Sequence, residues 1–137
     1  MGRVIVTFEL SNYYDVQQAA RGNIAPDKIR RIAIQGVVDT GATRLVLPKG
    51  VADLLGLPVS GQVTVQYGDK RSGTRDMVND AFVQLLGRGS VFNAVVEPNR
   101  TDALIGAIVM EDLDLIVDCG KNQIVPRDPN GIISEVE

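Results

Sequence analysis

The sequence predicts a mostly β, barrel-like domain with one or two short helices. Short runs rich in β-branched residues recur along the chain, turn-forming residues separate them, and the segments with helical spacing are few and brief. The chain has 137 residues, of which 45% are hydrophobic and 23% are charged. This size and composition suit one folded core, so we expect a single domain over residues 1–137.

The predicted strands follow one another through most of the chain. A cluster of β-branched residues predicts the first strand at 4–10, and a second at 31–35 continues through Gly36 into an apolar stretch. Period-two alternation predicts a strand at 62–67, with alternate side chains on one face. Further strands are expected at 77–85, 91–96, 115–118 and 122–126, with turns at 68–73, 87–90 and 130–131.

Helix is expected to be a minor component. Residues 51–55 place apolar side chains at helical spacing, which predicts a short helix that ends at Gly56. Helical turns are also expected within residues 12–21 and 107–113.

Composition excludes several kinds of chemistry. The 14 Lys and Arg residues against 17 Asp and Glu give a net charge of -3 without a basic run, and aromatic residues are few, so no nucleic-acid partner is expected. The chain has no histidine and one cysteine, which excludes a Cys/His zinc site, a Ser-His-Asp triad and a Cys-His dyad within one chain. We expect neither a metal nor a cofactor, and chemistry based on carboxylates or hydroxyls.

The chain carries no recognisable targeting signal. Its start lacks a long apolar run followed by small residues, and no segment approaches the length that crosses a membrane. We therefore expect no membrane partner and a cytoplasmic location.

One carboxylate stands out, at the end of an apolar strand. Asp39 follows Val37 and Val38 and precedes Thr40 and Gly41, after which an apolar run resumes at residues 45–48. Burying a carboxylate is costly unless its charge is hydrogen-bonded or shared, which makes Asp39 a functional candidate. Gly41 lets backbone N–H groups approach the carboxylate closely. An ordinary Asx-type turn between two strands is the alternative.

Several motifs in order along the chain resemble the retropepsin-like aspartic proteases, the single-lobed relatives of the pepsins. The stretch 37–42 is followed by the apolar segments 45–48 and 54–57, then by a hairpin around 68–73, and finally by Ala-Leu-Ile-Gly at 103–106. The likeness covers roughly residues 30–126 and is greatest to cellular and bacterial members. It implies a single-lobe, closed acid-protease-like barrel with a flap hairpin.

The resemblance also implies roles for individual residues. Asp39 corresponds to the catalytic residue, and the residues implied to support its loop are Thr40, Gly41, Leu104, Ile105 and Gly106. The residues implied to bind substrate are Gly41, Ala42, Thr43, Tyr67, Gly68, Asp69 and Lys70. The sequence departs from viral members at Thr43, where many of them carry Asp, and at the charged flap tip.

Peptide hydrolysis without a metal or a covalent nucleophile needs one base to activate water and one acid to protonate the substrate. Two carboxylates about 3 Å apart perform both tasks because they share one proton. The chain offers a single Asp-Thr-Gly, so we expect a symmetric homodimer with Asp39 from each subunit at the two-fold axis, acting on a peptide or protein substrate.

Three alternatives remain open at this stage. A dimerisation or peptide-binding module on the same fold would keep the loop but hydrolyse nothing. The second Asp-x-Gly, residues 118–120, is able in principle to supply an intramolecular partner, although we expect Asp118 to be a turn or edge residue and Cys119 to be half-buried. A carboxylate-bound metal is weakly indicated because the acidic residues show no ligand spacing. The segments 4–10 and 132–133 are candidate dimer-interface strands.

Overall fold

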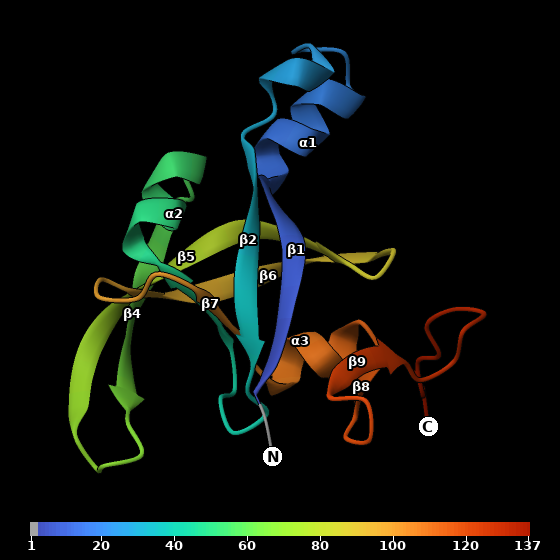
Figure 1. Cartoon of the computed structure of the whole chain (residues 1–137). Coiled ribbons are helices and arrows are strands. Elements are labelled where there is room, and N and C mark those ends of the chain that lie inside the picture. Colours follow the sequence, from blue (N-terminus) through green and yellow to red (C-terminus); the bar gives the residue numbers. More distant parts are fainter. Residues whose placement is uncertain (1–2) are drawn as a thin grey trace.

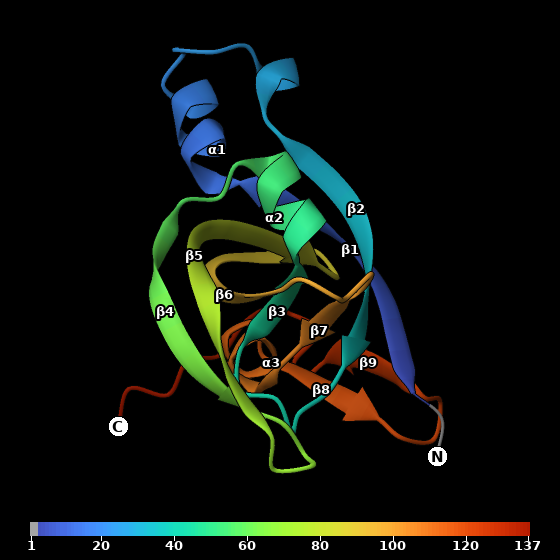
Figure 2. The same ribbon diagram turned by 90° about the vertical axis from the view of Figure 1, so that its left-hand side faces the viewer.

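A closed barrel forms the body of the protein (Figures 1 and 2). The computed structural model describes residues 3–137; Met1 and Gly2, where the predicted domain begins, lie outside the described residues. The main sheet has the strand order β1-β2-β7-β3-β6-β5-β4, and β1 also pairs with β5. That pairing closes six strands into a ring and leaves β4 outside it, as the partner of β5 alone. The predicted mostly β barrel is confirmed.

The strands of the main sheet are β1 (Val4–Asn12), β2 (Arg31–Val38), β3 (Leu45–Pro48), β4 (Val59–Gln66), β5 (Ser72–Leu85), β6 (Arg88–Glu97) and β7 (Ala103–Ile105). A separate two-stranded sheet contains β8 (Leu115–Asp118) and β9 (Gln123–Pro126). The helices are α1 (Tyr13–Ala20), the 3-10 turn η1 (Pro26–Lys28), α2 (Lys49–Leu55) and α3 (Ala107–Asp112). All the predicted helical segments are confirmed. None of the helices in the described part of the chain is long and apolar enough to cross a membrane.

Alternating side chains from the strands fill the barrel interior. Leu10, Leu47, Val83 and Ile105 come from four different strands and are fully buried. Leu55 of α2 is also fully buried in this core, so the helix covers one end of the barrel. Burial of side chains of this size stabilises the fold by about 1.5–3 kcal/mol each, and the ring of strands makes the core continuous.

Two turns differ from the sequence prediction. The strand expected at 77–85 begins earlier, at Ser72, because its first residues pair with β4 to form a long hairpin. The turn expected at 87–90 is tighter and consists of Leu86 and Gly87, both with positive φ, while Arg88 already pairs with Leu85. A two-residue turn of this hand matches the twist of the flanking strands. The Arg88 side chain donates hydrogen bonds to the carbonyls of Leu113, Asp114 and Asp128, which ties this hairpin to the segments on either side of the small sheet.

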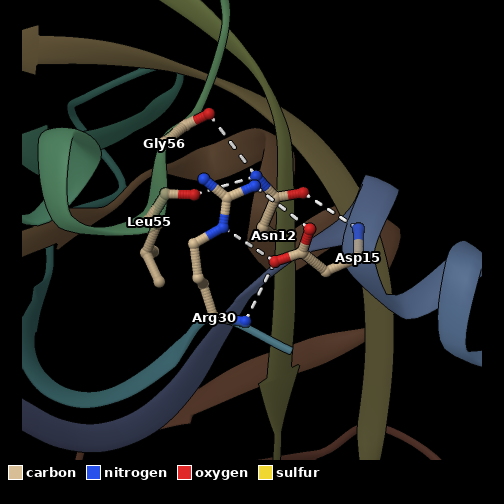
Figure 3. A network of polar contacts seen from close by, with 5 residues as sticks. All are labelled: Asn12, Asp15, Arg30, Leu55 and Gly56. Atoms are coloured by element: carbon tan, nitrogen blue, oxygen red, sulfur yellow. Dashed lines mark hydrogen bonds and ion pairs between the residues drawn. The ribbon is translucent and has the colours of Figure 1, made fainter. Parts of the chain in front are cut away.

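A polar network fastens α1 and α2 to the barrel end opposite the tip of the β4–β5 hairpin (Figures 1 and 3). Asn12 caps α1 by accepting a hydrogen bond from the Asp15 backbone N–H (3.1 Å), and its Nδ2 donates to the carbonyl of Leu55 (2.8 Å). The Asp15 carboxylate accepts bonds from the backbone N–H, Nε and Nη2 of Arg30, at 3.0, 2.8 and 3.1 Å. Asn12 and Asp15 are both buried, so these bonds satisfy polar side-chain atoms that are largely removed from water.

We expect Asp15→Asn to lower the free energy of unfolding at pH 7 by about 1–2 kcal/mol, because half-exposed Arg30 then loses a charged partner. The hydrogen bonds from Arg30 hold the pKa of Asp15 below its ordinary value of 3.8, against the opposing effect of burial. A carboxyl group whose pKa is lowered by folding stabilises the folded state above its unfolded pKa. This contribution is lost as the pH falls below about 4. Urea unfolding at pH 7 and at about pH 3 should therefore show a gap between wild type and variant that narrows in acid.

Asp53→Asn is the matched control, since Asp53 pairs with Lys49 on the exposed face of α2. An exposed i,i+4 pair contributes little to stability, so the unfolding midpoint should stay in place. A midpoint shift in Asp53→Asn equal to that in Asp15→Asn would contradict a special role for the buried network.

Candidate active site

The loop between β2 and β3, residues 39–44, is held by backbone hydrogen bonds. The Asp39 N–H donates to the carbonyl of Ile105 (3.0 Å), which extends the parallel pairing of β2 with β7 by one residue. The Ala42 N–H donates to the Asp39 carbonyl (3.1 Å) and closes a turn. The Gly41 N–H donates to Asp39 Oδ1 (3.0 Å), so the carboxylate itself is oriented by its own loop.

A second segment, at the junction of β7 and α3, packs against this loop. The N–H groups of Ala107 and Ile108 donate to the carbonyls of Ala42 (2.8 Å) and Thr43 (3.0 Å). Gly106 is buried at the place where this junction meets the loop. A Cβ atom at residue 106 would lie 2.4 Å from the carbonyl oxygen of Arg44 and 2.8 Å from that of Ala42. The loop therefore approaches this junction as closely as it does because residue 106 has no side chain.

The residues predicted to support the loop hold different positions around it. Ile105 is fully buried in the core, while Leu104 is half-buried. Leu104 lines each of the two hollows described below, one on either side of the loop. Thr40 is exposed.

The expectation that the carboxylate lies buried is wrong for the single chain. Val37 is buried and Val38 half-buried, but the chain leaves the barrel after them, so Asp39 is exposed. Asp39 and Thr40 border a hollow of about 570 Å³, whose other lining residues are Arg3, Val4, Val37, Val38, Arg100, Leu104, Val117 and Cys119.

The carboxylate of the second Asp-x-Gly accepts a hydrogen bond from its own turn. Asp118 is the last residue of β8, and its Oδ1 accepts a hydrogen bond from the Lys121 N–H (3.1 Å) across the turn to β9. Cys119 is exposed rather than half-buried, because it follows the end of β8 in that turn. Within residues 3–137, no cluster of three or more acidic or Cys side chains is arranged to hold a metal ion.

A larger cleft lies between the Asp39 loop and the hairpin of β4 and β5. Its volume is about 660 Å³. The residues that line it are Gly41, Ala42, Thr43, Arg44, Val46, Val63, Thr64, Val65, Gln66, Tyr67, Arg71, Arg75, Val95, Glu97, Asn99, Arg100 and Leu104. In Figures 1 and 2 the hairpin tip and the loop lie at the same end of the barrel. This arrangement places a flap-like hairpin beside the loop.

The cleft includes some of the predicted substrate-binding residues and not others. Gly41, Ala42, Thr43 and Tyr67 line it, but Gly68, Asp69 and Lys70 form the hairpin turn beyond its wall. Asp69 accepts hydrogen bonds from the backbone N–H (3.1 Å) and Nε (2.6 Å) of Arg71, and Lys70 adopts a positive φ of 70°. The roles of these three residues in substrate binding stay predictions.

Sequence reasoning missed a charged network inside the cleft. Glu97, at the end of β6, accepts hydrogen bonds from the Tyr67 hydroxyl and from Arg75 Nε, each at 2.5 Å. Burial favours a higher pKa for Glu97, but these two donors outweigh it and hold the pKa below its ordinary value. The same bond to Glu97 raises the pKa of Tyr67. At neutral pH the cleft therefore holds an ionised carboxylate and a protonated phenol, which join the hairpin to the barrel.

Comparison with known proteins places the chain in a family. Residues 27–109, more than half of the chain, match the sequence model of a family described as aspartyl protease. No curated protein sequence matches the chain significantly.

Two solved structures are similar to the chain. One is the solution structure of the Simian Foamy Virus (mac) protease, with 13% identity and a TM-score of 0.45, over 57% of this chain and 80% of that chain. The other is the crystal structure of the retroviral protease-like domain of Ddi1 from Leishmania major, with 20% identity and a TM-score of 0.49, over 71% and 81% of the two chains. The family match extends from just before β2 through the Asp39 loop and the flap-like hairpin into α3, and on that match the chain belongs to the aspartyl protease family.

Proposed function

We propose that the protein is a homodimeric aspartic endopeptidase in which the Asp39 carboxylates of two subunits activate water to hydrolyse a peptide bond. The observation that carries the proposal is the geometry of Asp39. Its carboxylate is exposed at the end of a barrel strand and its loop is fixed by Ile105 and the Gly106 junction. Asp39 borders the smaller hollow, and residues 41–44 of the same loop line the cleft beside the hairpin. A catalytic carboxylate needs this combination of access and fixed position.

The reaction follows from two such carboxylates placed side by side. Two adjacent acids share one proton, so one is a base that takes a proton from water and the other an acid that protonates the carbonyl oxygen of the substrate. The N–H of Gly41 holds Asp39 Oδ1 within the loop, which leaves Oδ2 for the water or the partner's acid. The water oxygen adds to the carbonyl carbon and gives a tetrahedral diol. The carboxyl group that took the proton from water then gives it to the leaving amine as the C–N bond breaks, and the other carboxylate takes a proton from the diol, so the pair again holds one shared proton.

The second subunit is inferred from the residues that the single chain leaves exposed around Asp39. Asp39 and Thr40 are exposed and border the 570 Å³ hollow, several of whose walls are valines of β1, β2 and β8. Ile5, which pairs with Val37 across β1 and β2, is 56% exposed. A second subunit related by a two-fold axis would cover this apolar surface and bring its own Asp39 to the first. Each Thr40 hydroxyl would then be available to bond across the axis.

The substrate is proposed to be an extended peptide. The cleft lies between the Asp39 loop and β4, the strand outside the closed ring. A peptide in this position is able to make strand-like hydrogen bonds, and closure of the hairpin over it would exclude water from the reaction.

Two measurements on the purified protein test the proposal. Sedimentation should give twice the 14.7 kDa chain mass. Incubation with an unbiased peptide pool from mildly acidic to neutral pH should release fragments that appear in mass spectra and disappear with a statine-type inhibitor. Cleavage that resists the inhibitor but stops with a chelator would contradict the proposal in favour of a metal site. Peptide binding without cleavage under any condition would favour the non-catalytic module.

A further inference from the structure

The cleft has a local charge opposite to that of the whole protein. Four of its lining residues are arginines, namely Arg44, Arg71, Arg75 and Arg100, and one is a carboxylate, Glu97. The chain as a whole has a net charge of -3. Asp69 and Asp102, just outside the lining, pair with Arg71 and Arg100, and a positive excess remains because Arg44 has no such pair among the described residues.

The bonds to neighbouring acidic residues and carbonyls use only some of the N–H donors of these arginines. Arg75 bonds to Glu97 and to the Thr74 carbonyl, and Arg100 bonds to the side chain and carbonyl of Asp102. A guanidinium group has five N–H donors, so each of these two keeps donors for a ligand.

The other two arginines make fewer hydrogen bonds. The Arg71 side chain bonds to Asp69 through Nε alone and lies over the Tyr67 ring, 5.3 Å from its centroid. Within residues 3–137, the Arg44 side chain makes no hydrogen bond and no ion pair. Arg44 also lines a second hollow, which it shares with Asp112, and among the cleft arginines it is the one with no directly bonded carboxylate.

The surroundings strengthen electrostatic interactions at two of the cleft arginines. The side chains of Arg75 and Arg100 are each only 28% exposed. An anion that entered there would leave part of its water behind, and its attraction to the guanidinium groups would be less screened than at an open surface. Guanidinium groups also match carboxylates in shape, through two parallel N–H bonds.

Part of the cleft wall is aliphatic, although Thr43, Thr64, Gln66, Tyr67 and Asn99 also line it. The aliphatic side chains come from Val46, Val63, Val65, Val95 and Leu104, on strands of both the barrel and the hairpin. An extended peptide presents alternate side chains to opposite sides. A peptide that combines aliphatic side chains with carboxylates therefore complements both parts of the lining.

We infer that the cleft selects peptides in which acidic side chains, glutamate or aspartate, accompany aliphatic ones, and that Arg44 is a principal specificity residue. The inference rests on the proposed peptidase function, because it names the substrate class of the same cleft. Arg71, Arg75 and Arg100 contribute further N–H donors, while Glu97 keeps Arg75 in place.

Binding and cleavage of one matched peptide series test this inference. The probes are fluorescently labelled octapeptides in which valine alternates with glutamate, glutamine or lysine. Binding is measured by anisotropy with the Asp39→Asn protein, and cleavage is measured with the wild type. We expect the glutamate peptide to bind about tenfold more tightly than the glutamine peptide, the effect of about one charge-assisted hydrogen bond. The lysine peptide should bind more weakly than both, and about 0.5 M salt should shrink these differences.

Variants of Arg44 test whether this residue causes the preference for the glutamate peptide. In the Asp39→Asn background, Arg44→Gln should reduce the ratio of glutamate to glutamine affinity to about threefold or less. Arg44→Glu should abolish the glutamate preference and raise the affinity for the lysine peptide relative to the glutamate peptide. The ratio is internal to each variant, so it does not depend on the fraction of folded protein. Arg21→Glu is the control, because it makes the same charge change just after α1, at the end of the barrel away from the cleft. It should leave the ratio unchanged.

The outcomes separate this inference from the proposed function. A glutamate preference in binding without cleavage of any peptide would support the acidic specificity and overturn the peptidase proposal. Equal affinity for the three peptides, or a preference for lysine, would overturn the acidic specificity even if cleavage occurs. A glutamate preference that survives in Arg44→Glu, or that disappears equally in Arg21→Glu, would overturn the assignment of Arg44.

Discussion

The Asp39→Asn protein is expected to lose peptide hydrolysis by at least about 10³-fold while it stays folded. An amide neither accepts a proton from water at neutral pH nor shares one with a second carboxylate, so both catalytic tasks fail together. The fold should survive because Asp39 is exposed and its side chain accepts one bond, from the Gly41 N–H at 3.0 Å, which an amide oxygen also accepts. Cleavage of the best peptide from the pool, followed by mass spectrometry, measures the loss.

Asp118→Asn is the matched control, since Asp118 begins the other Asp-x-Gly of the chain. Its carboxylate accepts the Lys121 N–H within the β8–β9 turn, and we place it outside the catalytic machinery. Its cleavage rate should match that of the wild type. Full activity in Asp39→Asn would contradict the catalytic role of Asp39, and an equal loss in both variants would favour an intramolecular pair.

Gly106→Ala is expected to cost about 3 kcal/mol of folding free energy or more and to reduce cleavage about 10²-fold in the protein that remains folded. The added methyl group would lie 2.4 Å from the Arg44 carbonyl oxygen and 2.8 Å from that of Ala42. Both contacts are with backbone, so no side chain is able to rotate away. The loop would have to move, which would weaken the bonds from Ala107 and Ile108 and displace Asp39. Urea unfolding and kcat of the residual folded protein measure the two effects.

Gly50→Ala provides the comparison for that substitution. Gly50 is an exposed residue of α2, and no atom lies within 4 Å of the position that a Cβ would occupy. Alanine is a better helix former than glycine, so stability should stay the same or rise by up to about 1 kcal/mol. Equal stability of Gly106→Ala and the wild type would show that the Asp39 loop tolerates a side chain at residue 106.

Local patterns in the sequence were sufficient for most of the fold. β-branched runs and period-two alternation predicted the strands at 4–10 and 62–67, and helical spacing before Gly56 predicted α2. These features depend on residues close together in the chain, where side-chain periodicity and turn chemistry act directly. The boundary of β5 was harder to predict, because Ser72 becomes strand through its pairing with Gln66 across the hairpin.

Some features of the candidate site were also predictable from local sequence, and others were not. The sequence by itself determined the family, through the Asp-Thr-Gly loop and the later Leu-Ile-Gly, because each motif is a short run with a fixed local geometry. Only the tertiary structure decided that Asp39 is exposed in one chain and that Glu97 meets Tyr67 and Arg75 inside the cleft. Glu97 is 30 residues from Tyr67 and 22 from Arg75 along the chain. Contacts at such separations arise from the closure of the barrel and the course of the hairpin, which no local pattern encodes.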